Sequence, residues 1–217
     1  MRRTTSGFTL IELLIVISII GVLAAVLLPA ILENKDAANL LADQMNLKRH
    51  FEWYTIYQSK HRQSLPSEGG HKFVLATWTS NTVEHTPENF DRYFVPGIRD
   101  NNINYQDMRK AVTNGEDPWP DLKSTNSQDT DYAGRARDHL RTSTQGAEQA
   151  WMADDNEGVW SHNDGSVNIL FNGGVVRTYS YQELSERFSL GKFDRSATPM
   201  DTWGPNSPIP ECQKLDR

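Results

Sequence analysis

The pattern of hydrophobic and polar positions divides the chain into a strongly apolar N-terminal segment and a mixed remainder. From Phe8 to Leu28 there are 21 positions, and Glu12 is the only charged residue among them. As a helix rising about 1.5 Å per residue, this segment would be roughly 30 Å long, close to the hydrocarbon thickness of a bilayer. The pattern therefore predicts one membrane-spanning helix, which we place at residues 8–32.

A helical repeat of apolar residues continues from Asp36 to about Lys60. The repeat comprises Leu40, Leu47, Phe51 and Tyr54, with Leu41 and Met45 beside them. The opposite face carries Asn39, Asp43, Asn46, Arg49 and Gln58. We expect the apolar face to pack on a globular domain and the polar face to meet water or other subunits. Together the two segments predict one helical spine of about 50 residues.

Charges on either side of the apolar segment indicate its orientation. Arg2 and Arg3 precede it, whereas Glu33, Lys35 and Asp36 follow it without a basic excess. The positive-inside rule then leaves the N-terminus in the cytoplasm and exports the rest of the chain. We therefore expect a single-pass inner-membrane protein with an extracytoplasmic domain at residues 33–217.

A short motif joins the basic leader to the apolar segment. It reads Gly7-Phe8-Thr9-Leu10-Ile11-Glu12. This motif resembles the type III leader and N-terminal helix of type IV pilins and type II secretion pseudopilins. The resemblance implies that a prepilin peptidase and methyltransferase removes residues 1–7, cutting between Gly7 and Phe8, and methylates the new N-terminus at Phe8. It also implies an α+β, pilin-like fold, in which the long helix packs on a small antiparallel sheet with long loops.

Glu12 is unusual because an ionised carboxylate near one end of a membrane helix costs a few kcal/mol unless it is paired. Cleavage after Gly7 would expose an amine on Phe8, about one helical turn away. The resemblance implies that Glu12 attracts the Phe8 amine of a neighbouring subunit during assembly into a filament of pilin-like subunits. The alternative is that Glu12 lies at the membrane interface and is solvated by lipid headgroups.

The leader also permits a different interpretation, an ordinary secretory signal peptide cut near Leu23-Ala24-Ala25. Such processing would release a soluble domain. The charged Glu12 and the continuation of the apolar run through Val26, Leu27 and Leu28 count against it.

A second motif near the C-terminus places Asn172-Gly173 nine residues after His162. It resembles the H-X9-DG element of a class of prepilin-like proteins, with Asn172 in place of the usual Asp. Asn-Gly favours a two-residue type I′ turn, so the sequence predicts a hairpin of Val167 to Phe171 with Gly174 to Tyr181, within residues 160–181. In that register Ile169 lies opposite Val176, and Leu170 opposite Val175.

His162 has two possible roles. Its ring can bond a loop carbonyl or the hairpin end, which would be structural. Alternatively it belongs to a calcium site built with carboxylates, because Ca²⁺ prefers hard oxygen ligands. The candidate ligands are Asp154, Asp155, Glu157 and Asp164.

The middle of the chain carries weaker signals. Phe73 to Thr79 is rich in β-branched and aromatic residues and predicts a strand. Asp100 to Asp131 predicts long loops with a helical turn at Tyr105 to Val112. Asp131 to Met152 is typical of an exposed helix.

Composition narrows the class of protein. The formal net charge of −6 disfavours nucleic-acid binding, and loss of Arg2 and Arg3 would make the chain more acidic still. Cys212 is the only cysteine, so the C-terminal region cannot be closed by an intrachain disulfide, unlike that of many pilins. No motif for catalysis is present. We therefore predict a prepilin-like structural subunit that is not an enzyme and needs no cofactor; the alternative is a membrane-anchored periplasmic ligand-binding or hydrolytic domain.

Overall fold

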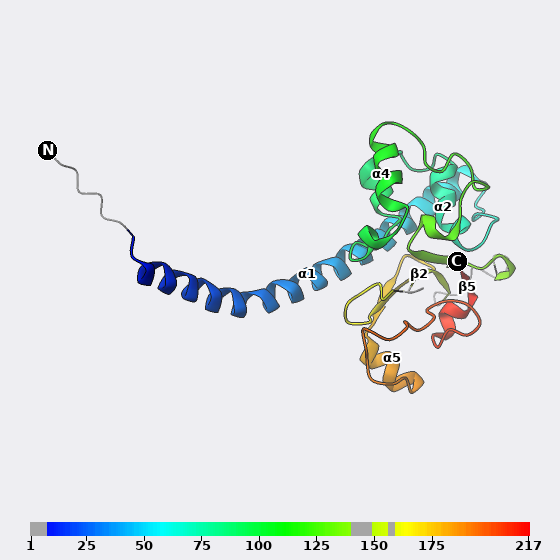
Figure 1. The fold of residues 1–217 in the computed structure, drawn as a ribbon. Coiled ribbons are helices and arrows are strands. Elements are labelled where there is room, and N and C mark those ends of the chain that lie inside the picture. The colour runs from blue at the N-terminus through cyan, green and yellow to red at the C-terminus, as the bar shows by residue number, and fades with distance from the viewer. Residues whose placement is uncertain (1–7, 140–148, 156–158) are drawn as a thin grey trace. The chain divides into compact units, whose positions relative to one another are not determined.

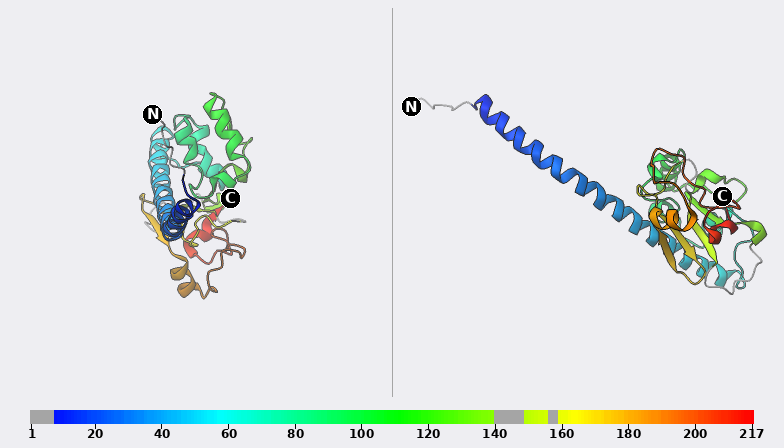
Figure 2. Two further views of the ribbon diagram at one scale, coloured as in Figure 1. Left: turned by 60° about the vertical axis from the view of Figure 1, so that its left-hand side comes forward. Right: turned by 90° about the horizontal axis from the view of Figure 1, so that it is seen from below.

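The computed structural model describes residues 8–139, 149–155 and 159–217. Contacts divide the chain into two compact units, one ending at Ala38 and one covering Asn39–Arg217. Helix α1, Leu10–Lys60, is one continuous element of 51 residues, unbroken in each view (Figures 1 and 2). Its N-terminal half is long and apolar enough to cross a membrane. The predicted spine is therefore confirmed.

The C-terminal half of α1 buries a different face from the predicted one. Leu47 and Tyr54 are buried as expected, but Leu41 and Met45 are exposed, whereas Asp43 is completely buried. The buried residues of α1 are Asp43, Asn46, Leu47, His50, Trp53 and Tyr54. Their spacing of three and four residues defines one stripe along the helix. The prediction that Asp43 and Asn46 face water was wrong. Sheet residues donate hydrogen bonds to Asp43, and polar groups just after α3 bind Asn46 inside the domain.

The second unit contains a five-stranded antiparallel sheet with strand order β4-β3-β2-β1-β5. The strands are β1 Tyr132–Arg135, β2 Ala150–Asp154, β3 Val167–Phe171, β4 Val176–Tyr179 and β5 Leu215–Asp216. This sheet confirms the predicted α+β architecture.

Two hydrophobic cores are built against the sheet. The larger core joins α1 to three further helices, α2 His71–Thr79, α3 Pro87–Asp91 and α4 Tyr105–Thr113. The smaller core joins the strands to α5 Tyr181–Phe188 and the 3₁₀ helix η4 Pro210–Lys214. Figure 1 shows α2 and α4 on one side of the sheet and α5 on the other. Three short 3₁₀ helices complete the fold, η1 Arg99–Asn101, η2 Ser127–Asp129 and η3 Arg137–His139.

Two predicted elements in the middle of the chain were wrong. The expected strand from Phe73 to Thr79 is helix α2, in which every residue from Phe73 to Trp78 is buried. A helix buried on all sides lacks a polar face, so its composition resembles that of a buried strand. The expected exposed helix from Asp131 to Met152 instead contributes the buried strands β1 and β2, separated by residues 140–148, which lie outside the described ranges. The helix at Tyr105–Thr113 is confirmed.

The β3–β4 hairpin forms as predicted, but its register is shifted by one residue. Leu170 pairs with Val176, and Ile169 with Arg177. Gly173 and Gly174 have φ angles of 89° and 80°. Both glycines adopt left-handed backbone conformations, so the connection takes three residues instead of two. The amide of Phe171 donates to the carbonyl of Val175 across the connection.

The C-terminal residues are held without a disulfide. Strand β5 pairs with β1, and the Nε atom of Arg217 lies 2.8 Å from the buried Oδ2 of Asp155. Arg217 also donates to the carbonyl of Ser127 at 3.0 Å. A strand pairing and an ion pair therefore replace the covalent closure that Cys212, a buried free cysteine, cannot provide.

Candidate functional site

The first candidate site is the start of α1, where the sequence places the processing and assembly residues. Gly7 lies outside the described residues, and Phe8 is 74% exposed. Thr9 and Glu12 form a reciprocal cap: Oε2 of Glu12 accepts from the amide of Thr9 at 2.9 Å, and Oγ1 of Thr9 accepts from the amide of Glu12. The hydroxyl of Thr9 also donates to Glu12. Thr-x-x-Glu is a capping box, so the Glu12 carboxylate has a helix-starting role besides any role in assembly.

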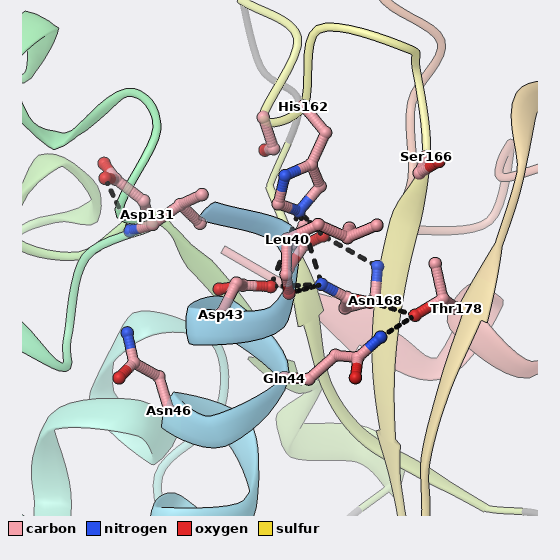
Figure 3. A network of polar contacts seen from close by, with 12 residues as sticks. Leu40, Asp43, Gln44, Asn46, Asp131, His162, Ser166, Asn168 and Thr178 are labelled. Carbon is pink, nitrogen blue, oxygen red and sulfur yellow. Dashed lines mark hydrogen bonds and ion pairs between the residues drawn. The ribbon is translucent and has the colours of Figure 1, made fainter. Parts of the chain in front are cut away.

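The second candidate site is a buried polar cluster formed by Asp43, Asp154, His162 and Asn168. Figure 3 labels Asp43, His162 and Asn168. Nε2 of His162 lies 3.0 Å from Oδ2 of Asp154 and 3.5 Å from Oδ2 of Asp43. The side-chain amide of Asn168 donates to Asp43, and its backbone N–H donates to Asp154 Oδ2 at 2.7 Å. Asp43 therefore shares one set of contacts with three residues that lie more than 100 positions further along the chain.

Each member of the cluster is placed by a different element. Asp43 lies on α1, Asp154 ends β2, and Asn168 lies on β3. His162 begins the turn before β3, in which the amide of Gly165 donates to the His162 carbonyl at 3.0 Å and Gly165 has a φ of 72°. The turn therefore aims the imidazole back at the helix and the sheet.

A ring of neutral donors surrounds the cluster. The hydroxyl of Tyr132 donates to Asp43 Oδ1, and the hydroxyl of Thr178 donates to the side-chain oxygen of Asn168. Gln44 in turn donates to Thr178 at 2.7 Å (Figure 3). These donors do not reach Oδ1 of Asp154, which is buried and accepts no hydrogen bond from the described residues.

Burial and mutual charge shift the pKa values of this cluster. Burial disfavours the charged imidazole, but the carboxylates of Asp154 and Asp43 outweigh it and raise the pKa of His162 to about 10. Burial, followed by repulsion from Asp43, raises the pKa of Asp154 to about 8. Burial also opposes ionisation of Asp43, yet hydrogen bonds and attraction from His162 lower its pKa overall. The pKa values of the two carboxylates therefore move in opposite directions, since two carboxylates beside one imidazole in a buried site do not both ionise readily.

The structure separates the residues of the predicted calcium site. Asp154 lies beside His162, but Asp155 faces Arg217 and accepts from Trp203 at 2.9 Å. Asp164 accepts from the amide and hydroxyl of Ser166 within its own turn. Glu157 lies outside the described residues, whereas Asn172 and Gly173 lie in the hairpin connection. Among described residues, the group with metal-binding spacing is instead Asp43, Asp154 and His162.

Comparisons with known proteins concern a limited part of the chain. The model of the prokaryotic N-terminal methylation motif matches residues 2–28. The type IV wide pilus major component PilA4 of Thermus thermophilus is 62% identical over 56 residues, which are 26% of this chain and 43% of that protein. The N-terminal segment is type IV pilin-like. This result favours a prepilin leader over a secretory signal peptide at the start of α1.

The chain is also similar to core protein G of the type II secretion system from several bacteria. Type II secretion system core protein G of Klebsiella michiganensis is 33% identical over 63 residues, 28% of this chain and 44% of that protein. Core protein G of Pectobacterium carotovorum is 31% identical over 87 residues, 39% of this chain and 52% of that protein. The chain thus covers about half or less of these pilin-like relatives. No solved structure matches it significantly.

Proposed function

We propose that this protein is a prepilin-like structural subunit that assembles through its N-terminal helix into a type IV pilus or a type II secretion pseudopilus. The observation that carries the proposal is the methylation motif at residues 2–28, leading directly into a continuous helix with an apolar first half. Its partners are other pilin-like subunits, and further copies of itself. Its work is assembly without catalytic turnover.

Processing at the start of α1 follows from this proposal. A prepilin peptidase cuts after Gly7 and methylates Phe8, whose side chain is exposed just before the first residue of α1. Before assembly the protein is a single-pass inner-membrane protein, with its leader in the cytoplasm and residues 33–217 in the periplasm.

Glu12 is the assembly charge in this proposal. Its carboxylate already accepts from Thr9, so the amine of a neighbouring Phe8 joins a preformed acceptor that the cap holds in place. The capping box and the docking role therefore use the same oxygens, and a variant must separate them.

A non-enzymatic role agrees with the burial of the second site. The side chains of Asp43 and Asp154 are completely buried, and that of His162 is 4% exposed, so a substrate would not reach them without opening of the domain. The competing function, a membrane-anchored hydrolytic or ligand-binding domain, requires an accessible set of such groups.

The mass of the membrane-extracted protein tests processing. We expect loss of residues 1–7 and the addition of one methyl group. An uncut chain, or a chain cut near Ala25, would support the anchored or the secreted alternative and contradict the proposal.

Two substitutions of Glu12 test docking. Glu12→Ala removes both the charge and the cap, whereas Glu12→Gln removes the charge but keeps an oxygen that can accept from Thr9. We expect both variants to be inserted and cut normally, and both to be depleted from sheared filaments. Normal incorporation of Glu12→Gln would show that the charge is not needed and would refute the docking role. Depletion of Glu12→Ala alone would then assign the effect to the cap.

A further inference from the structure

We propose that Asp43, Asp154 and His162 bind a divalent transition-metal ion, with Zn²⁺ as the best fit, inside the globular unit. This inference is independent of filament assembly, because all three residues belong to the unit Asn39–Arg217.

The spacing of the donor atoms suits a small ion. One ligand atom from each of the three side chains lies within 4.8 Å of the others. Nε2 of His162 lies 3.0 Å from Oδ2 of Asp154 and 3.5 Å from Oδ2 of Asp43. Around Zn²⁺ with bonds of about 2.1 Å, neighbouring tetrahedral ligands lie roughly 3.4 Å apart. The side chains therefore need little movement to enclose an ion.

One carboxylate oxygen of Asp154 also indicates a cation site. Asp154 is completely buried, and its Oδ1 accepts no hydrogen bond from the described residues. A buried carboxylate oxygen without a donor is costly, and a cation held by both oxygens of Asp154 would remove that cost. The same cation would balance both carboxylates in their ionised form, whereas the imidazole of His162 alone can balance only one.

The groups around the three ligands form the kind of outer shell that metal sites use. Tyr132 holds Asp43 through Oδ1, and the backbone amide of Asn168 holds Asp154 through Oδ2. Such bonds orient ligating carboxylates. The side chain of Asn168 points at Asp43 and lies 3.3 Å from His162 Nε2 (Figure 3). If the amide turns over, it presents an oxygen as a fourth ligand.

The donor set selects the class of metal. An imidazole with two carboxylates suits Zn²⁺, and also Mn²⁺ or Co²⁺, whereas Ca²⁺ and Mg²⁺ prefer oxygen ligands alone. Because the site is buried and joins α1 to β2 and the turn before β3, a bound ion would link three elements and stabilise the fold.

The test uses the full-length protein in detergent, first freed of metal with a chelator. One equivalent of Zn²⁺ should bind per chain. At free Zn²⁺ about 100 times its dissociation constant, the melting temperature should rise by roughly 5–10 °C. Ca²⁺ and Mg²⁺ at the same concentration should leave the melting temperature unchanged. Equal melting temperatures in Zn²⁺ and in chelator, with no metal retained after refolding in Zn²⁺, would overturn the proposal.

Variants and a spectroscopic probe identify the ligands. Co²⁺ in place of Zn²⁺ should give visible d–d absorption. His162→Gln should remove both this absorption and the Zn²⁺-dependent rise in melting temperature. His85→Gln is the control, because His85 also lies 3.5 Å from a carboxylate, that of Asp117, but is partly exposed and lies outside the cluster. If His162→Gln does not fold, the wild-type comparison of Zn²⁺ with chelator still decides the question. An unchanged Co²⁺ spectrum in folded His162→Gln would contradict the site.

Discussion

Gly174 in the hairpin connection is the position where one added methyl group tests the contact between the sheet and α1. A Cβ atom built on Gly174 would lie 2.6 Å from Cδ1 and 2.8 Å from Cε1 of the Phe51 ring. Gly173 offers a matched control, since its φ of 89° is as unfavourable as the 80° of Gly174 but its Cβ would meet nothing within 4 Å.

The expected losses follow from these two effects. A left-handed conformation costs an alanine about 1–2 kcal/mol, which applies to both glycines. Displacement of the Phe51 ring adds about 1–3 kcal/mol at Gly174 alone. We therefore expect Gly173→Ala to lower the free energy of unfolding by about 1–2 kcal/mol and Gly174→Ala by about 2–5 kcal/mol.

Urea unfolding of the full-length protein in detergent, followed by tryptophan fluorescence, measures the difference. Trp151 is a suitable reporter because its ring centroid lies 5.7 Å from that of Phe51. The double variant Phe51→Leu with Gly174→Ala should lose less stability than the sum of the two single variants, because the clash is absent. Equal losses for Gly173→Ala and Gly174→Ala, or simple additivity in the double variant, would refute the packing argument.

Two further predictions concern buried charges. Burial lowers the pKa of His50 to about 4, although a hydrogen bond with the Arg92 carbonyl opposes the shift, so the unfolded chain binds this proton first. Stability therefore falls as pH drops from about 6.5 towards 4. Wild type should lose about 3 kcal/mol more than His50→Gln between pH 7.5 and 4 in urea unfolding, and parallel curves would contradict this. Arg217→Met should lower the free energy of unfolding by about 3 kcal/mol because it removes the ion pair between Arg217 and the buried carboxylate of Asp155. Arg187→Met, which removes a half-exposed pair with Glu211, should cost under about 1 kcal/mol, and similar losses for both variants would count against the pairing.

The sequence predicts best those elements whose signal is local. The spine α1 follows from an uninterrupted apolar run and a helical repeat, and the hairpin follows from Asn172-Gly173 between apolar residues. The register failed because Gly174 also adopts a left-handed conformation, and a single glycine pair does not indicate the length of its connection. Helix α2 failed because complete burial removes the polar face that would mark a helix.

The cluster was predictable only in part. His162 stood out through its motif, and Asp154 through its acidic neighbourhood. Asp43 could not be recognised, since a carboxylate on an amphipathic helix is usually solvated, and its partners Tyr132 and Asn168 lie 89 and 125 residues further along the chain. Such pairings are set by the tertiary fold and leave no local pattern.

Those separations also constrain the order of events during synthesis. Asp43 leaves the ribosome long before Asn168, so the stripe of α1 that becomes interior must spend that interval in contact with water or chaperones. Aliphatic side chains throughout the stripe would make the unfinished chain prone to aggregate. Asp43 and Asn46 make this stripe less apolar, and Asp43 gains its partner Asn168 only when β3 has been synthesised.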